Sequence, residues 1–338
     1  MSEPYLQITV IIPVYNAEAF VEQAVGSALE QAEVVEVLLV EDGSTDGSLA
    51  KCEALAAESE RVQLLRHPNG ENRGAAETRN VGVREATQDW VAFLDADDYY
   101  LPGRFQAVAN VLAEHPDADG IYDAVGTHFE SDEMRQWWAD RGRGELSTVR
   151  KRVAPDELFE AITGNLGSFH TNGIVVRREF FERTGMFDAE LRMAQDFALW
   201  IKMAAIGKLY PGAIDRAVAM RRLHGDNRIV QQRSEHRKYG LLMWQVLSRW
   251  AAQQKLSAYY RQKLAMGQFH AWKQMTAAER GECMGFSGDL RFLGRLAQEH
   301  PVCLQSRRFW KHTARAMGGS RLRAMLRPPA KAEATNQA

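Results

Sequence analysis

Three aspartates stand within four positions directly after an apolar run, in the stretch WVAFLDADDYYLPG from Trp90 to Gly103. The carboxylates of Asp95, Asp97 and Asp98 repel one another at this spacing, so the arrangement is costly unless positive charge balances it. Hard divalent cations commonly take one or two protein carboxylates together with the phosphates of a substrate. The motif therefore predicts a Mn²⁺ or Mg²⁺ site here, although aspartates also cap turns and helices.

Two further carboxylates stand where elements begin or end. Asp42 closes the apolar run in LLVEDGS, and Asp196 precedes the helix-forming segment FALWIKMAAIG. An aspartate at the start of a helix is a favoured N-cap. The same position holds a carboxylate rigidly enough to take a proton from a substrate hydroxyl. Both roles are open to Asp196, and they are compatible.

The elements that must position these side chains alternate through the first hundred residues. Amphipathic stretches with helical spacing separate short apolar runs that have the pattern of buried strands, at 8–14, 35–44, 61–67 and 89–95. Asn16 and Asp46 can cap the first two helices, and a third helix is expected at 74–86. This rhythm predicts an α/β domain with a largely parallel sheet.

Parallel sheets bind ligands beyond the carboxyl ends of their strands. Asp42, Asp95 and Asp97 each follow an expected strand. These three carboxylates should therefore converge on one edge of the sheet.

The pattern changes after the first hundred residues. Between about residues 120 and 169 the chain reads as a charged and aromatic excursion, with no core element assigned to it. A strand and short helix are expected at 171–188, a helix at 194–207, and helices throughout from His236. We expect a catalytic domain at 1–230, a helical region at 231–327 and a disordered tail at 328–338.

Composition limits the class of protein. A net charge of −2 argues against a dedicated nucleic-acid binder, whose phosphate contacts need a basic excess. The three cysteines, Cys52, Cys283 and Cys303, show no CxxC spacing, which favours a reducing compartment and speaks against a cysteine zinc site. The first residues lack the basic segment of a signal peptide, and no apolar stretch reaches the roughly 20 residues that span a bilayer. These features predict a cytoplasmic protein.

The segment 307–331 has eight basic residues and no acidic one, with apolar residues interspersed. A basic amphipathic helix can lie on an anionic membrane, which allows peripheral contact with the inner face of the cell membrane. A helix packed on its own domain or on a second copy is the alternative.

Several motifs occur in a fixed order along the chain. They are PVYN, EDGSTDGS, the pattern NxGxxxxRNxG from Asn72 to Gly82, and FLDADD followed by LPGRF. Together they resemble the nucleotide-binding half of a family 2 glycosyltransferase with the GT-A fold. The resemblance continues through HTNGIVVRREFFERTGMFD and covers roughly residues 6–228. Each motif alone is weak, and their order and spacing carry the likeness.

The resemblance implies a donor site at the first strands. Pro13 and Tyr15 match the position that packs on the nucleobase, and Asp42 matches the carboxylate that accepts a hydrogen bond from the uracil ring. Arg79 is placed to reach the base or the phosphates, unless it is a surface helix charge. Asp95, the first acid of the DxD motif, would contact the ribose.

The resemblance also implies the metal ligands and the base. Asp97 would bind the divalent metal, and His224 in RRLHGDNR would complete its shell. Asp196 matches the family's catalytic base, although Gln195 stands where a glutamate is usual. Asp98 is an additional acid that caps the following turn or acts through water, and it is the most dispensable of the three.

Other residues near these motifs carry open alternatives. Arg221 and Arg222 are placed to clamp phosphate. His170 lies on a loop expected to face the acceptor. The pair Trp137 and Trp138 either stacks on a sugar acceptor or packs the excursion onto its domain.

The implied activity is transfer of a sugar, with inversion, from a nucleotide-sugar to an acceptor hydroxyl. A UDP-sugar is the first choice of donor, with dTDP- and GDP-sugars as alternatives, and the acceptor is a glycan or lipid-linked glycan in bacterial cell-surface polysaccharide synthesis. One rival is a degenerate GT-A protein that acts as a binding or scaffold subunit. Another is a nucleotidylyltransferase, whose Gly-rich basic signature is absent near the first strand.

Overall fold

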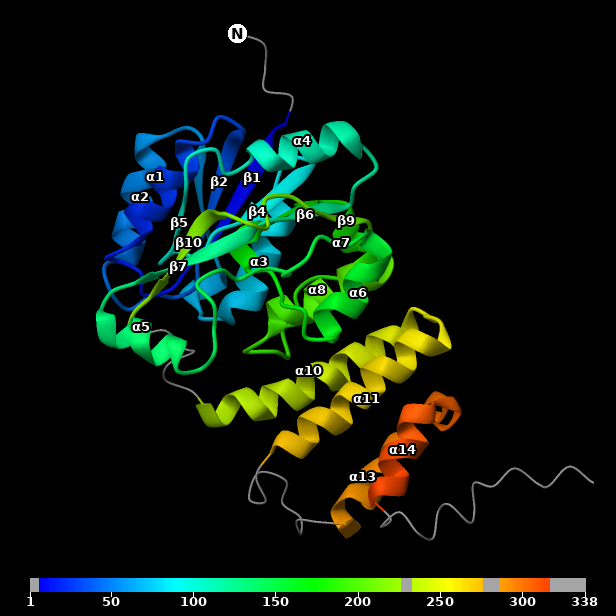
Figure 1. Ribbon diagram of the computed structural model, residues 1–338. Helices are drawn as coiled ribbons and strands as arrows, with labels where there is room; N and C mark the ends of the chain where they lie inside the picture. The colour runs from blue at the N-terminus through cyan, green and yellow to red at the C-terminus, as the bar shows by residue number, and fades with distance from the viewer. Residues whose placement is uncertain (1–5, 226–232, 276–285, 317–338) are drawn as a thin grey trace, which may run out of the picture. The chain divides into compact units, whose positions relative to one another are not determined.

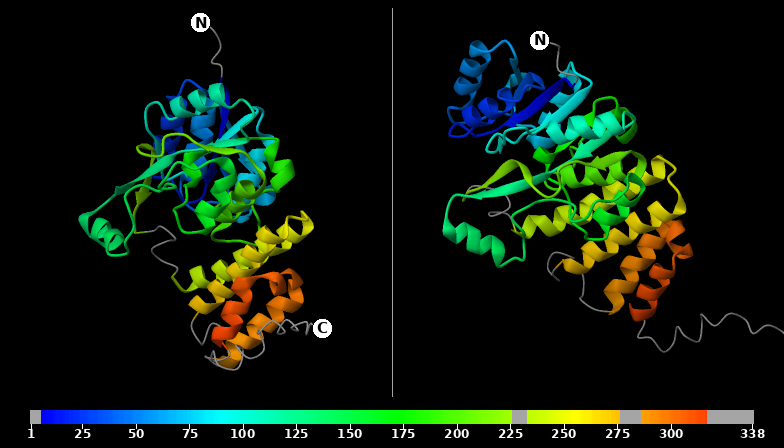
Figure 2. Two further views of the ribbon diagram at one scale, coloured as in Figure 1. Left: turned by 45° about the vertical axis from the view of Figure 1, so that its right-hand side comes forward. Right: turned by 45° about the horizontal axis from the view of Figure 1, so that its top comes forward.

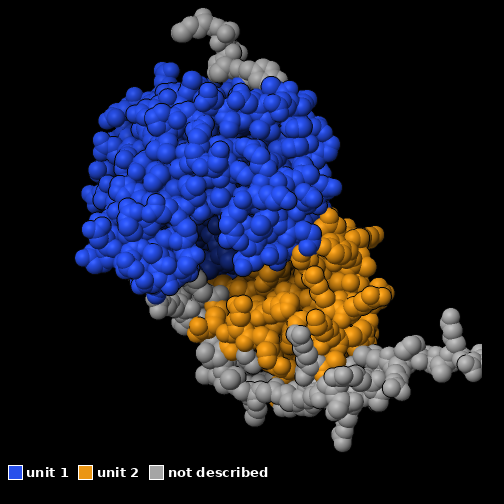
Figure 3. All heavy atoms as spheres, viewed as in Figure 1, with its two compact units in different colours: residues 1–232 blue, residues 233–338 orange. Residues whose placement is uncertain are grey.

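The computed structural model describes residues 6–225, 233–275 and 286–316. The chain divides into two compact units, residues 1–232 and 233–338, which Figure 3 distinguishes by colour. The expected tail at 328–338 and Cys283 lie outside the described residues. Each unit contains its own cluster of buried hydrophobic side chains.

A seven-stranded sheet runs through the first unit in the order β3-β2-β1-β4-β8-β6-β9 (Figure 1). Strands β1, β2, β3 and β4 are parallel, β8 is antiparallel to β4 and β6, and β9 is parallel to β6. The largely parallel α/β architecture expected from the sequence is confirmed. The strands are β1 (Ile8–Val14), β2 (Val34–Glu41), β3 (Val62–Arg66), β4 (Trp90–Phe93), β6 (Gly120–Tyr122), β8 (Ile174–Arg177) and β9 (Leu209–Pro211).

The first strands are apolar on both faces because both faces are covered. Nearly every residue of β1 is buried, and all of β4 is buried. The helices α1, α2 and α3 pack against β1, β2 and β3. The helices of this unit are α1 (Val21–Leu29), α2 (Ser48–Glu58), η1 (Pro68–Gly70), α3 (Gly74–Glu85), α4 (Gln106–Glu114), α5 (Asp132–Ala139), α6 (Pro155–Thr163), η2 (Thr171–Gly173), α7 (Phe180–Thr184) and α8 (Gln195–Ile206).

The first helix begins later than the sequence suggests. Asn16 has a positive φ of 49°, and its Oδ1 accepts a hydrogen bond of 2.8 Å from the backbone N–H of Thr45. The side chain therefore joins the loops after β1 and β2, while α1 begins at Val21. The expected capping role of Asn16 is wrong for this reason.

The region between residues 120 and 169 contains core elements that the sequence analysis did not assign. Strand β7 (Ala124–Phe129) pairs in parallel with β10 (Ala217–Leu223), which is antiparallel to β5 (Tyr99–Tyr100) in a second sheet. Helix α6 packs against α8. Only the part around α5 extends as an excursion, at the outer end of β7 and β10 (Figure 2).

The second unit is helical in its described residues, as expected. Its helices are α10 (Arg233–Gln253), α11 (Ala258–Gln274), α13 (Phe286–Glu299), η3 (Pro301–Gln305) and α14 (Arg307–Ala316). Phe269, Trp272 and Phe292 form the centre of its core, with ring centroids 4.8 to 6.1 Å apart. The basic segment expected at 307–331 is described only as far as residue 316.

None of the helices in the described parts of the chain has the length and apolar character needed to cross a bilayer.

Candidate functional site

Three of the expected residues follow the carboxyl ends of β1, β2 and β4 at one edge of the large sheet: Tyr15, Asp42 and Asp95. Val14 pairs with Glu41 across β1 and β2, so Tyr15 and Asp42 follow neighbouring strand ends. The backbone N–H of Asp42 donates to the carbonyl of Val14 at 2.9 Å. Pro13 lies within β1, and the ring of Tyr15 is 43% exposed. An exposed aromatic ring at this edge offers a stacking surface to a planar ligand.

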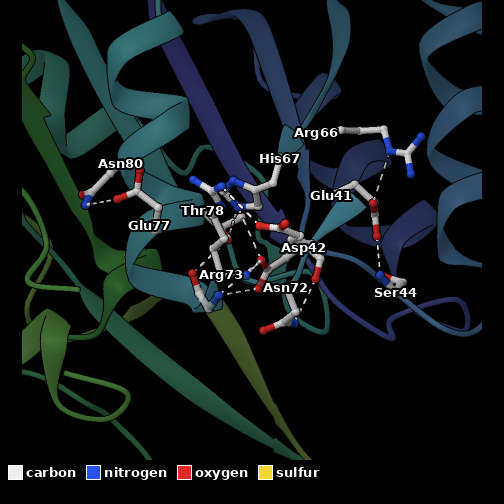
Figure 4. A network of polar contacts seen from close by, with 12 residues as sticks. Glu41, Asp42, Ser44, Arg66, His67, Asn72, Arg73, Glu77, Thr78 and Asn80 are labelled. Atoms are coloured by element: carbon white, nitrogen blue, oxygen red, sulfur yellow. Dashed lines mark hydrogen bonds and ion pairs between the residues drawn. The ribbon is translucent and has the colours of Figure 1, made fainter. Parts of the chain in front are cut away.

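Asp42 is the centre of a polar network between β2 and α3, shown in Figure 4. Its carboxylate accepts hydrogen bonds from the backbone N–H groups of Arg73 at 2.6 Å and Gly74 at 3.0 Å. His67 lies 3.3 Å from the same carboxylate, and the Asn72 side chain donates to the Asp42 carbonyl at 2.8 Å. Asp42 therefore fixes the start of α3. Its expected hydrogen bond to uracil stays a prediction.

Arg79, on α3, points toward the end of β4. Its Nη2 donates to Asp95 at 2.5 Å, and its guanidinium lies 5.6 Å from the ring centre of Phe187. Arg79 is only 6% exposed, and its Nε and Nη1 are buried without a hydrogen-bond partner among the described residues. Burial opposes ionisation of Asp95, but the charge of Arg79 and its hydrogen bond to the carboxylate hold the pKa of Asp95 below its usual value. The surface-charge alternative for Arg79 is thus wrong.

Asp97 and His224 are brought together although 127 positions separate them. The Nε2 of His224 lies 3.1 Å from Oδ2 of Asp97, and both side chains are partly buried. The ring of Phe20 lies 5.2 Å from the ring of His224. A carboxylate suits both Mg²⁺ and Mn²⁺, whereas an imidazole favours the transition metal, Mn²⁺.

Asp98 has a different environment from its two neighbours. It is 2% exposed, and its carboxylate accepts hydrogen bonds from the Asn172 side chain at 2.6 Å and the Arg222 backbone at 2.7 Å. Burial, followed by the charges of Asp97 and Asp95, raises the pKa of Asp98 well above its usual value. Asp98 joins the aspartate loop to two other segments, so the view of it as the most dispensable acid is wrong for the fold.

A second set of possible metal ligands lies beside the first. Oxygen atoms of Asp95 and Asp98 and a ring nitrogen of His170 lie within 4.8 Å of one another. Burial, then the charge of Arg221, lowers the pKa of His170 to about 4, which leaves the imidazole neutral at pH 7. Asp95 is paired with Arg79, however, and both carboxylate oxygens of Asp98 accept hydrogen bonds. Asp97 and His224 likewise contact each other, at 3.1 Å, and their binding of a divalent cation stays a prediction.

Asp196 lies near the N-terminus of α8. It is the second residue of that helix, and its Oδ1 accepts a hydrogen bond of 2.8 Å from the N–H of Phe197. The N-cap is Ala194, whose φ of 60° is unusual for a residue other than glycine. Asp196 is thus not the N-cap, and its Oδ2 lies 3.4 Å from the hydroxyl of Thr171.

The segment η2 connects the aspartate loop with Asp196, which the sequence analysis did not foresee. Thr171 contacts Asp196, and the next residue, Asn172, accepts a hydrogen bond of 3.0 Å from the N–H of Asp95. A fully buried ion pair between Arg104 and Asp123 supports this segment, because Arg104 also donates to the Asn172 carbonyl at 3.2 Å. In the sequence, the only indication that this segment belongs to the site was the nearby His170, on a loop expected to face the acceptor.

The two neighbouring arginines on β10 have separate roles. Arg222 donates to the carbonyl of Asp97 at 3.0 Å and to Gln23 at 2.6 Å, so it holds the loop. Arg221 lies over Trp138, with its guanidinium carbon 4.5 Å from the ring centre. Trp138 is buried, which favours the packing alternative for this residue, whereas Trp137 is partly exposed.

Comparison with known proteins agrees with this geometry. The model of the family described as "Glycosyl transferase family 2" matches residues 9–185, which is more than half of the 338 residues. The chain is 30% identical over 200 residues to EpsJ of Bacillus subtilis, described as an uncharacterized glycosyltransferase, covering 56% of this chain and 53% of EpsJ. It is 28% identical over 211 residues to the succinoglycan biosynthesis protein ExoU of Rhizobium meliloti, covering 60% of this chain and 58% of ExoU. The chain thus spans about half the length of the curated relatives it matches.

Solved structures share the fold at low sequence identity. The S. aureus TarS fragment 1–349 in complex with UDP-GlcNAc has a TM-score of 0.64 and 19% identity, covering 88% of this chain and 82% of that one. The mannosyltransferase PcManGT from Pyrobaculum calidifontis, in complex with GDP-Man and Mn²⁺, has a TM-score of 0.51 and 18% identity, covering 96% and 88%. These likenesses confirm the GT-A fold expected from the sequence. The family match over residues 9–185 shows that the chain belongs to glycosyl transferase family 2.

Proposed function

We propose that the chain is an inverting, metal-dependent glycosyltransferase that moves a sugar from a nucleotide-sugar donor to an acceptor hydroxyl. One observation carries this proposal more than any other. The edge of the sheet that presents Tyr15 also presents Asp95 and Asp97. The buried Arg79 reaches this edge, and its Nε and Nη1 have no hydrogen-bond partner among the described residues. A ligand with a planar base and a diphosphate supplies both a stacking partner and anionic oxygens for such a site.

Asp196 is proposed as the general base. Its carboxylate contacts Thr171 of η2, and the next residue, Asn172, is bonded to the aspartate loop. As the acceptor oxygen forms its bond to the anomeric carbon, Asp196 takes the hydroxyl proton, and the bond from that carbon to the diphosphate breaks with its electron pair. A single displacement of this kind inverts the configuration and needs no covalent glycosyl-enzyme.

Asp97 and His224 are proposed to hold the divalent metal. A bound cation would neutralise charge on the departing diphosphate. Two hydrogen bonds hold the backbone of Asp97 in place. The N–H of Asp98 donates to the carbonyl of Asp95 at 3.0 Å, and the side chain of Arg222 donates to the carbonyl of Asp97 at 3.0 Å. Three arginines of the described residues, Arg79, Arg221 and Arg222, supply positive charge beside the aspartate loop.

A UDP-sugar is our first choice of donor. The TarS fragment has been solved with UDP-GlcNAc and with UDP, which supports this choice, whereas PcManGT was solved with GDP-Man. Asp42, which the family resemblance assigns to uracil, keeps its carboxylate beside the loop that begins α3. Tyr15 on the neighbouring strand end would pack on the base.

We propose a glycan or lipid-linked glycan as the acceptor, in the building of a cell-surface polysaccharide. The name of the relative ExoU, a succinoglycan biosynthesis protein, supports this pathway class. Cytoplasmic location and peripheral membrane contact stay predictions, since most of the segment 307–331 lies outside the described residues.

The test is release of nucleoside diphosphate by purified protein from UDP-, GDP- and dTDP-sugars, with and without added Mn²⁺ and acceptor. We expect Mn²⁺-dependent release by the wild type, strong loss in Asp97→Asn and Asp196→Asn, and normal release in Asp156→Asn, whose exposed side chain lies on α6. Product analysis by NMR should show the anomeric configuration opposite to that of the donor.

The same assay separates the enzyme from a binding or scaffold protein. A scaffold would bind a nucleotide-sugar without turnover, and Asp196→Asn would then change nothing. Absence of both binding and turnover with all three donor classes would refute the proposal as a whole.

A further inference from the structure

Arg221 and Arg222 follow each other on β10, and successive residues of a strand point to opposite faces. Arg222 is bound to the backbone of Asp97 and to Gln23. Arg221 is placed otherwise, because its Nε and Nη2 are buried without a hydrogen-bond partner among the described residues. The two arginines therefore differ in role: the Arg222 side chain makes structural hydrogen bonds to Asp97 and Gln23, whereas Nε and Nη2 of Arg221 make none among the described residues.

Unpaired guanidinium donors that are shielded from solvent are unusual in folded proteins and call for a partner. Arg79 shows the same pattern, with Nε and Nη1 buried and unpaired. One arginine comes from α3 and the other from β10. Arg79 donates to Asp95, and the N–H of Arg222, next to Arg221 in sequence, donates to Asp98, so both cations lie by the aspartate loop. Two such cations there indicate a ligand with several anionic oxygens.

The surroundings of Arg221 locate this ligand. Met220, the residue before it on β10, pairs with Tyr99, and the N–H of Arg222, the residue after it, donates to the Asp98 carboxylate at 2.7 Å, so Arg221 lies next to the aspartate loop. On its other side the guanidinium lies against the buried ring of Trp138, 4.5 Å from the ring centre. The indole N–H of Trp138 donates to the carbonyl of Gly144 at 2.9 Å, which holds the ring in place.

We propose that Arg221 binds a phosphate oxygen of the donor's diphosphate and stabilises the departing nucleoside diphosphate, with Trp138 orienting the guanidinium. This inference rests on the proposed function. A guanidinium presents a planar fork of donors that matches phosphate geometry, and stacking on an aromatic ring keeps that fork in one orientation.

The step in which Arg221 acts is the displacement itself. The acceptor oxygen bonds to the anomeric carbon, the bond from that carbon to the phosphate oxygen breaks, and the electron pair stays on the leaving diphosphate. The proton of the acceptor goes to Asp196. Arg221 transfers no proton, because arginine stays protonated, and its contribution is charge stabilisation where negative charge develops.

The chain offers a matched control for this role. Arg143 also lies over Trp138, with its guanidinium carbon 4.6 Å from the ring centre, but its side chain is exposed. Arg143→Gln and Arg221→Gln therefore remove the same charge from the same aromatic ring. Only the second substitution removes buried donors next to the aspartate loop.

The experiment measures binding of UDP, UMP and uridine to the full chain by calorimetry with Mn²⁺ present. In Arg221→Gln we expect UDP to bind about tenfold more weakly or worse, UMP to lose less and uridine to lose nothing. Arg221→Lys should fall between that variant and the wild type, and Arg143→Gln should bind like the wild type. Unchanged uridine binding also shows that a variant is folded.

Three results would overturn the inference. UDP binding that is unaffected in Arg221→Gln, an equal loss for UDP and uridine, or an equal loss in Arg143→Gln would each do so while leaving the proposed function intact. A wild type that binds none of the three compounds would instead refute the donor assignment, and this inference with it.

Discussion

The side-chain amide of Asn172 donates a 2.6 Å hydrogen bond to the carboxylate of Asp98, and both side chains are almost completely buried. The amide oxygen of Asn172 also accepts a hydrogen bond of 3.0 Å from the N–H of Asp95. One amide therefore fixes the backbone and the side chain of the aspartate loop at the same time. The loop owes its shape to a residue 77 positions away from Asp95 along the chain.

Replacing Asn172 should destabilise the first unit, and the same-sized Asn172→Asp should be more harmful than the smaller Asn172→Ala. Asn172→Ala leaves the partly buried N–H of Asp95 without its acceptor and removes a donor from the buried Asp98, which we expect to cost about 2–4 kcal/mol of unfolding free energy. Asn172→Asp keeps the size but places a second carboxyl against Asp98. We expect it to be less stable than Asn172→Ala at pH 7, as measured by thermal unfolding.

Lower pH should narrow the difference between these two variants. Two facing carboxyls raise the pKa of the pair in the folded state, so the folded protein binds more protons than the unfolded chain and loses stability as the pH rises. Asn110 is exposed on α4, and its Ala and Asp variants serve as controls that should shift the unfolding temperature little. Equal unfolding temperatures for Asn172→Asp and the wild type at pH 7 would contradict the role of this hydrogen bond.

Asp97→Asn should separate metal binding from folding. The substitution keeps the shape of the side chain, removes a charge beside His224, and relieves repulsion with Asp98. We therefore expect loss of Mn²⁺-dependent turnover and of Mn²⁺-enhanced UDP binding, with an unfolding temperature equal to or above that of the metal-free wild type. His224→Gln should raise the Mn²⁺ concentration needed for half-maximal activity. A clear fall in the unfolding temperature of Asp97→Asn would return this aspartate to a structural role.

The arrangement of the sheet edge was predictable because parallel strands end on one side. Tyr15, Asp42 and Asp95 follow strand ends that pair directly, so their convergence needed only the strand assignments. The approach of His224 to Asp97 was predictable only through the family resemblance, since 127 residues separate them and neither shows a local pattern. Helix α6 was missed although it begins with Pro155 and has acidic residues in its first turn, which are ordinary signals of a helix start.

The supports behind the site could not be predicted in the same way. Asn172 and the buried pair of Arg104 with Asp123 act through tertiary contacts, which leave no periodicity in the sequence. Asparagine and arginine are mostly surface residues, so their residue types predict exposure, whereas Asn172 and Arg104 are both fully buried. The same holds for Asp98, which the sequence presented as the most dispensable acid, whereas the structure buries it and bonds it to Asn172 and Arg222.

Asp196→Asn should lower the rate of transfer while leaving the donor site unchanged. An asparagine has the same shape but cannot take the acceptor proton, so we expect a loss in kcat of about 10²–10⁴-fold. UDP affinity should stay at the wild-type value, because Asp196 lies on α8, where its side chain contacts Thr171. Thr171→Val, which removes a contact of 3.4 Å, should have a much smaller effect. A parallel loss of UDP binding in Asp196→Asn would place this residue in the donor site and leave the base unidentified.

His170 should make the protein less stable in mild acid. Burial and the charge of Arg221 lower the pKa of His170 to about 4 in the folded chain, whereas an unfolded histidine titrates near pH 6.5. Between these values the unfolded chain takes up a proton that the folded chain does not, so stability falls as the pH drops from about 6.5 toward 4 and is unaffected by this group above that range. At pH 5 the resulting loss is on the order of 1–2 kcal/mol. His170→Gln should remove this component, so its unfolding temperature relative to the wild type should be higher at pH 5 than at pH 7.5. A difference that does not change with pH would show that the pKa of His170 is not lowered in the folded protein.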